Sequence, residues 1–234
     1  MCFSAEASFT ASAVLTVVGV ATQRKVHKSS QILFASVPLF FAVQQFSEGI
    51  LWSILPGGAY PGLEKIAAYI FLAIAKAGWP LIIPLSILLM EQDKKRKNAL
   101  FVFLALGIFS SLCCVGYLFF CDFHPVISGH HIRYLNDLSW KYSVKVLYYI
   151  STIVEVFYYI STVFPLFISS IKRIRLLGIL MAGSCIVSAI FFSRYITSVW
   201  CFFAAILSIV VYFIISESEK GFSRGNAVEA AQNT

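Results

Sequence analysis

The chain has 234 residues, of which 59% are hydrophobic and only 12% are charged, and its mean hydropathy is +0.83. Soluble domains carry about 25% charged residues, so this composition excludes an ordinary soluble protein. The net charge of +7 comes from basic residues gathered in short loops, a pattern that does not indicate a nucleic-acid partner.

Seven long apolar segments follow one another along the chain. A helix needs about 20 mostly apolar residues to cross the hydrocarbon core of a bilayer. The sequence therefore predicts an all-α fold, a polytopic membrane protein built as a bundle of seven transmembrane helices. Residues 1–215 are expected to form this domain, and residues 216–234 a disordered tail. The predicted spans are 7–22, 31–54, 65–90, 99–121, 144–169, 176–192 and 198–215.

The basic residues alternate between the two ends of these spans. Twelve lie in the loops after the first, third and fifth spans and in the tail, whereas five lie on the opposite side. Loops rich in Lys and Arg stay in the cytoplasm. The sequence therefore predicts an N-terminus outside the cell and a cytoplasmic C-terminus and tail.

The second span carries polar residues that are costly in lipid. Gln44 and Glu48 are four residues apart and share a helix face, with Gln45 beside them. Gly49 permits close approach of another helix. One interpretation is a carboxylate in a polar ligand site, and the other is a hydrogen bond that joins two helices.

The fifth span places Glu155 near its middle. By helical spacing, Tyr148 and Tyr159 lie on or near the same face, together with three smaller hydroxyl side chains. These residues form either a structural polar seam or part of a ligand site. Lys76, in the third span, is a candidate partner for the carboxylate.

The longest stretch outside the spans, 122–143, is predicted to be an outer loop and contains three of the four histidines. The N-terminal cysteine and the start of the seventh span are expected at a similar depth. Cysteine, histidine and carboxylate together suit a borderline-soft metal such as zinc. The alternative is that these residues never converge. The candidate metal ligands are Cys2, Glu48, His130, His131 and Cys201.

Several stretches resemble an uncharacterised bacterial family of seven-helix membrane proteins, a domain of unknown function. They are Met1–Ala5 with Ala7–Phe9, Pro38–Gly49 with Trp52, Trp79–Pro80, Gly129–Ile132 with Tyr134, and Ser198–Ala205. The resemblance implies the helical membrane fold and a location in the bacterial inner membrane. It implies no activity.

Three functions fit the pattern of residues. The first is a membrane protein that binds a small ligand, lipid or metal ion at a polar site near the outer face. The second is a membrane-embedded, metal-dependent lipid hydrolase, although the chain lacks the His-x-x-x-His of seven-helix hydrolases of the alkaline ceramidase type. The third is a small transporter. The sequence leaves open whether the protein is an enzyme.

Overall fold

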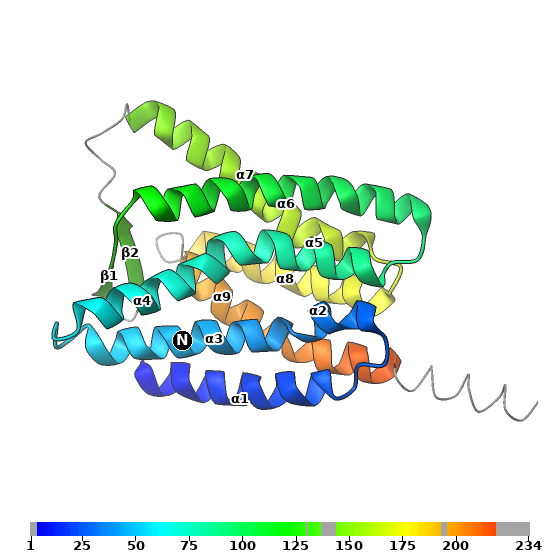
Figure 1. Cartoon of the computed structure of the whole chain (residues 1–234), viewed down its shortest axis with the longest axis horizontal. Helices are drawn as coiled ribbons and strands as arrows, with labels where there is room; N and C mark the ends of the chain where they lie inside the picture. The colour runs from blue at the N-terminus through cyan, green and yellow to red at the C-terminus, as the bar shows by residue number, and fades with distance from the viewer. Residues whose placement is uncertain (1–3, 130, 137–143, 193–195, 219–234) are drawn as a thin grey trace, which may run out of the picture.

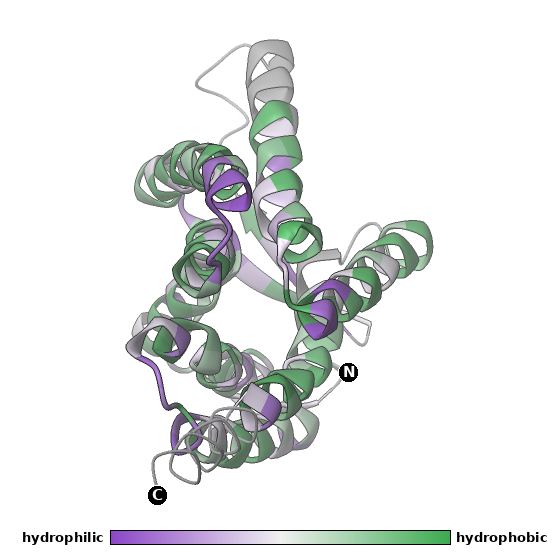
Figure 2. Cartoon of the chain, turned by 90° about the vertical axis from the view of Figure 1, so that its right-hand side faces the viewer, coloured by the Kyte–Doolittle hydropathy of each residue, from purple (hydrophilic) through white to green (hydrophobic). Residues whose placement is uncertain are grey.

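The computed structural model describes residues 4–129, 131–136, 144–192 and 196–218 and consists of long helices lying side by side (Figure 1). Seen from one end, the helices form a ring (Figure 2). The elements in chain order are α1 (Ala5–Gln23), η1 (Ser29–Gln31), α2 (Ile32–Ala35), α3 (Val37–Ile54), α4 (Pro61–Leu72), the π-helical η2 (Ala73–Gly78), α5 (Trp79–Met90), α6 (Lys94–Phe120), β1 (Phe123–Ser128), β2 (His131–Asn136), α7 (Val144–Ile168), α8 (Lys172–Phe191) and α9 (Ile196–Leu207).

Each of the seven predicted apolar segments is helical. Six are long and apolar enough to cross a membrane, which indicates a multi-pass membrane protein: Ala5–Gln23, Pro61–Met90, Lys94–Phe120, Ser151–Ile168, Lys172–Phe191 and Val199–Ser218. The segment that is not among the six, predicted as 31–54, is interrupted at Ser36 and carries the polar residues of α3. Helical turns continue to Ser218, and residues 219–234 of the predicted tail lie outside the described residues.

The stretch predicted as an outer loop contains a two-stranded antiparallel hairpin instead. Phe123 pairs with Asn136 and Ser128 with His131, and Gly129 begins the turn with φ +62°, in the left-handed region that glycine adopts readily. Two short runs of β-branched and aromatic residues around a glycine turn are the local cause.

The hairpin covers one end of the bundle, which we call the hairpin end (Figure 1). Ile132 is 1% exposed and packs with Leu51 of α3 and two alanines of α4. The Tyr134 ring stacks on Phe71 with the centroids 5.1 Å apart. The strands therefore fix the ends of α3 and α4 relative to each other.

The opposite end, which we call the basic end, is held by a buried carboxylate. The Glu91 Oε1 atom accepts from the N–H groups of Gln92 (2.9 Å) and Asp93 (3.1 Å), and Oε2 accepts from the N–H of Ser170 (2.7 Å). Burial raises the pKa of Glu91, but these backbone hydrogen bonds favour the charged form and bring the pKa below its usual value. The loop between α5 and α6 is thereby joined to the loop between α7 and α8.

Two prolines leave gaps in the hydrogen bonding of the long helical segment Pro61–Met90. The residue five positions after Ala75 is Pro80, and the residue four positions after Pro80 is Pro84, so neither carbonyl finds the N–H that a π- or α-helix would supply. The Tyr158 hydroxyl, on α7, donates to the Ala75 carbonyl at 2.7 Å. The Pro80 carbonyl instead lies against Gly107 of α6, where an added Cβ would be 1.9 Å from its oxygen.

Ser111 of α6 completes this junction by donating to the Ala77 carbonyl at 2.6 Å. The irregular backbone is therefore buried between α6 and α7, where side chains hydrogen-bond to its carbonyls. Non-helical backbone at membrane depth is tolerated only in such surroundings.

Replacing Gly107 with alanine should destabilise the protein. The added methyl group would overlap the Pro80 carbonyl, and overpacking costs about 1–3 kcal/mol, more than the ~1 kcal/mol gained from helix propensity. Gly116→Ala, on the same helix, is the control, because no described atom lies within 4 Å of its added Cβ. Thermal unfolding in detergent should show a lower Tm for Gly107→Ala alone. Equal Tm values for the two variants would contradict the close approach of α5 and α6.

Candidate functional site

The polar residues of α3 lie inside the bundle. Gln44, Gln45 and Glu48 are each 0% exposed. The helix is enclosed because α1 packs along one side of it, and α4 and α9 also contact it. Close packing against α1 depends on Gly49, where an added Cβ would lie 2.8 Å from the Phe9 ring.

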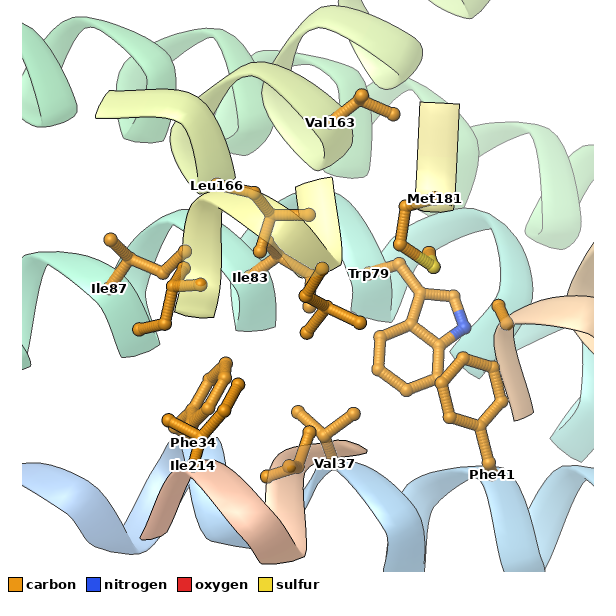
Figure 3. Packing of buried hydrophobic residues seen from close by; sticks show 14 of the residues in the cluster. Phe34, Val37, Phe41, Trp79, Ile83, Ile87, Val163, Leu166, Met181 and Ile214 are labelled. Carbon is orange, nitrogen blue, oxygen red and sulfur yellow. The ribbon is translucent and has the colours of Figure 1, made fainter. Parts of the chain in front are cut away.

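Gln44 connects three helices. Its Oε1 atom accepts from the indole N–H of Trp79 on α5 at 2.9 Å, and its Nε2 atom donates to the Cys201 Sγ atom on α9 at 3.7 Å. The Trp79 ring is held in place by stacking on Phe41, with centroids 4.1 Å apart (Figure 3). The amide is therefore fixed in one orientation, with both ends engaged.

Charged groups lie around this connection. The Glu48 carboxylate and the Lys76 ammonium each lie within electrostatic range of the Cys201 thiol. Lys76 also interacts electrostatically with Cys114 of α6, as does Glu155 of α7. We call these five residues, together with Gln44, the polar layer. It crosses the bundle from α3 to α7 and includes the π-helical segment, which supplies Lys76.

Three buried polar side chains beside the polar layer make no hydrogen bond with any described residue. Both amide atoms of Gln45, the Thr162 hydroxyl and the Trp200 indole N–H are unpaired. Thr162 is 3% exposed and Trp200 is 4% exposed. A buried polar group without a partner costs about 1–3 kcal/mol, so these atoms mark positions where a ligand or water would be stabilised.

A narrow cavity of about 30 Å³ is lined by Cys201 of the polar layer and by apolar side chains, several of which are drawn in Figure 3. Such a volume holds about two or three water-sized groups. Trp200, Thr162 and Cys201 are among the residues that line it, together with Phe34 and Met181, and the surface of the wall itself is apolar. The site therefore combines an apolar interior with two buried donors, on Thr162 and Trp200, that lack a described partner.

The residues predicted around Glu155 are distributed differently. Glu155 itself is exposed on α7, and Tyr159, which is half-buried, lies within its electrostatic range. The neighbouring Tyr158, not Tyr159, faces the interior. The side chain of Tyr148 lies outside the described residues.

The predicted metal centre receives no support from the described part of the chain. No three His, Cys, Asp or Glu side chains lie together there in a group that could hold an ion. Cys201 is a free thiol beside Gln44, while the His131 ring packs edge-on against Phe192 at 5.8 Å. Of the five candidate ligands, Cys2 and His130 lie outside the described residues, as does the expected proximity of Cys2 to Cys201.

Sequence reasoning missed two residues that organise the site. Trp79 binds Gln44, and Tyr158 binds the backbone of η2, yet both are aromatic residues within apolar segments, where packing alone would account for them. The available signal was Pro80, which follows Trp79 directly. A proline within a span leaves a carbonyl that needs another donor, and a tyrosine such as Tyr158 can supply it.

These features define a class: a multi-pass helical protein with a polar layer across its interior and an apolar cavity beside it. The chain belongs to DUF6629, a family of unknown function whose model matches residues 1–225. The expected membership of an uncharacterised family is thereby confirmed. No curated protein and no solved structure matches the chain.

Tyr158→Phe should lower the stability of the protein. The substitution leaves the Ala75 carbonyl buried without its 2.7 Å hydrogen bond, which costs about 1–3 kcal/mol. Tyr159→Phe is the matched control, because the Tyr159 hydroxyl makes no hydrogen bond with a described residue. Thermal unfolding should separate the two variants, and a Tyr158→Phe protein as stable as Tyr159→Phe would show that the carbonyl does not depend on this donor.

Proposed function

We propose that the protein binds a small, mostly apolar molecule that carries one hydrogen-bond acceptor, inside its helical bundle. The observation that carries this proposal is a pair of buried donors without a described partner, the Trp200 N–H and the Thr162 hydroxyl, on residues that line a cavity with an apolar surface. An acceptor on the ligand would hydrogen-bond to one or both donors, and its apolar part would occupy the cavity.

The chemistry of the cavity selects against other ligands. Ionised molecules would lose their hydration among Phe34, Ile83 and Leu166, which line the cavity below the donors. An alkane would fill the space but leave both donors without a partner. A ligand pocket that is largely apolar, with a few placed polar groups, obtains its specificity from those groups.

The polar layer would hold the ligand's polar end at a defined depth. Gln44 fixes Trp79 and Cys201, which both line the cavity, so ligand binding would be linked to the positions of α3, α5 and α9. Glu48 and Lys76 both lie within electrostatic range of Cys201, so opposite charges on them would offset each other at this end. A neutral acceptor would therefore lose less hydration there than an ionised one.

We further propose that the bundle lies in the bacterial inner membrane with its N-terminus outside and its C-terminus in the cytoplasm. The basic residues support this orientation, because loops with Lys and Arg remain cytoplasmic. The resemblance to a bacterial membrane family supports the choice of membrane. In this arrangement α3 also crosses the bilayer, shielded by α1, which gives the seventh span.

Reporter fusions test the orientation. Truncating the chain after Lys97 and attaching a reporter should give a cytoplasmic signal, because the fusion then keeps the four consecutive basic residues that begin α6. A fusion after Gly129, at the tip of the hairpin, should give a periplasmic signal. Reversed signals, or the same side for both fusions, would contradict the proposed topology.

Ligand binding is tested with two small probes of matched size and shape, the ketone acetone and the alkane isobutane, because the cavity of about 30 Å³ has room for only a few heavy atoms. The ketone should raise the Tm of the protein in nanodiscs more than the alkane does, because only the ketone accepts a hydrogen bond. Thr162→Val combined with Trp200→Phe removes both donors and should make the two shifts equal. Ala204→Phe, which places a ring at the cavity wall, should abolish both shifts.

The outcomes of this experiment are distinct. Equal shifts for ketone and alkane in the wild-type protein would contradict the role of the donors. Shifts that persist in Ala204→Phe would show that the probes act outside the cavity. Native circular dichroism of each variant separates lost binding from lost folding.

A small transporter is the second candidate, and one observation favours it. The helical segment Pro61–Met90 changes to π-helical geometry near its middle, in η2, and Lys76 lies in this stretch. Broken helices with polar groups at the bilayer midplane are typical of transporter binding sites. This function would use the same cavity but would also require flux of the bound molecule across proteoliposomes.

A further inference from the structure

A second, larger hollow lies on the outside of the bundle. Both α1 and α9 pack against α3, and they leave a groove of about 410 Å³ between them. This volume is within the range of about 300–1,000 Å³ that is typical of ligand pockets. Small side chains create the hollow, because Ala7 and Ala11 of α1 face Ala205 of α9.

The groove has one charged end and one apolar end. Glu6 and Thr10, one helical turn apart, line its start near the N-terminus of α1. Val14, Ile206 and Ile209 line the remainder, and Val14 and Ile206 are each 48% exposed. An amphipathic molecule would therefore lie with its polar group at Glu6.

The length of the groove matches one leaflet of a bilayer. The part of α1 that lines the groove runs from Glu6 to Leu15. These two residues are nine positions apart, which corresponds to about 14 Å along a helix. Half of the hydrocarbon core is about 15 Å thick. In the membrane arrangement proposed above, on which this step rests, the groove begins at the membrane surface and ends near the bilayer midplane, as one lipid chain does.

The charge at its mouth indicates which lipid. Glu6 lies in the first turn of α1, where the helix dipole stabilises a carboxylate. A carboxylate attracts cationic headgroups and repels lipids whose only charge is a phosphate. A primary ammonium can also donate hydrogen bonds to it, whereas a trimethylammonium group cannot.

We infer that this groove binds a phospholipid with a primary-ammonium headgroup, such as phosphatidylethanolamine, from the leaflet on the Glu6 side. The ammonium contacts the Glu6 carboxylate, and one acyl chain lies between α1 and α9. The Thr10 hydroxyl, one turn deeper, is placed to donate to an ester carbonyl of the lipid. This site is separate from the interior cavity and does not depend on what the cavity binds.

The test is native mass spectrometry of the purified protein with equal amounts of phosphatidylethanolamine, phosphatidylcholine and phosphatidylglycerol of identical acyl chains. The wild-type protein should retain phosphatidylethanolamine in preference to both others. Glu6→Gln should reduce this preference by about twofold to fivefold, the range expected for one exposed ion pair. Glu64→Gln is the control, since Glu64 lies in the first turn of α4 and outside the groove.

A second pair of variants tests the place of the acyl chain. Ile206→Trp fills the groove and should reduce retention of all three lipids. Ile190→Trp, on the exposed face of α8, should leave retention unchanged, because Ile190 is 69% exposed and lies outside the groove. Neither pair changes the donors of the interior cavity.

Two results would overturn the inference. An unchanged headgroup preference in Glu6→Gln, or an equal loss in Glu64→Gln, would show that Glu6 does not select the lipid. Retention that Ile206→Trp and Ile190→Trp affect equally would show that the chain lies elsewhere. The ketone test of the interior cavity has its own outcome, so failure of one proposal does not decide the other.

Discussion

Pro80 and Pro84 have no amide N–H, and the contacts made by the two carbonyls that lack these donors position α6 and α7 in the bundle. In an apolar medium every backbone carbonyl needs a donor or a close contact, and these prolines remove two donors from one helical segment. Tyr158 supplies one hydrogen bond, and Gly107 lets α6 approach the other carbonyl. Both α6 and α7 are therefore held against the irregular segment, and Lys76 is carried to the level of Cys114 and Cys201.

The buried polar side chains of this bundle differ in whether they have hydrogen-bond partners. Gln44 has partners on two other helices, so it contributes to the packing of the bundle. Thr162 and Trp200 have none among the described residues, although each is almost fully buried. Apolar residues of similar shape would avoid this desolvation cost, so these two donors are the observation on which the proposed ligand rests.

Long apolar segments could be predicted from the sequence because membrane-spanning length is a local property of the chain. Burial of Glu48 also follows from the sequence, since a carboxylate facing lipid is costly. The hairpin does not follow from the sequence, because two short strands give a weak signal within the stretch 122–143, which is predicted to be an outer loop. Contacts such as Trp79 with Gln44 join residues 35 positions apart and depend on how the helices are rotated. Helical spacing alone grouped Tyr159 with Glu155 but could not show that Tyr158 faces inward.

The Glu91 carboxylate imposes an order on assembly. Ser170 follows it by 79 residues, so a growing chain completes α5, α6 and α7 before the third N–H donor exists. Until then the carboxylate can bind only the N–H groups of Gln92 and Asp93, in its own loop. Once Ser170 has been synthesised, its N–H can donate to Glu91. This hydrogen bond joins the two loops at the basic end, on either side of α6 and α7. This contact therefore forms late in biosynthesis, when α8 begins, and marks the completion of the α6–α7 pair.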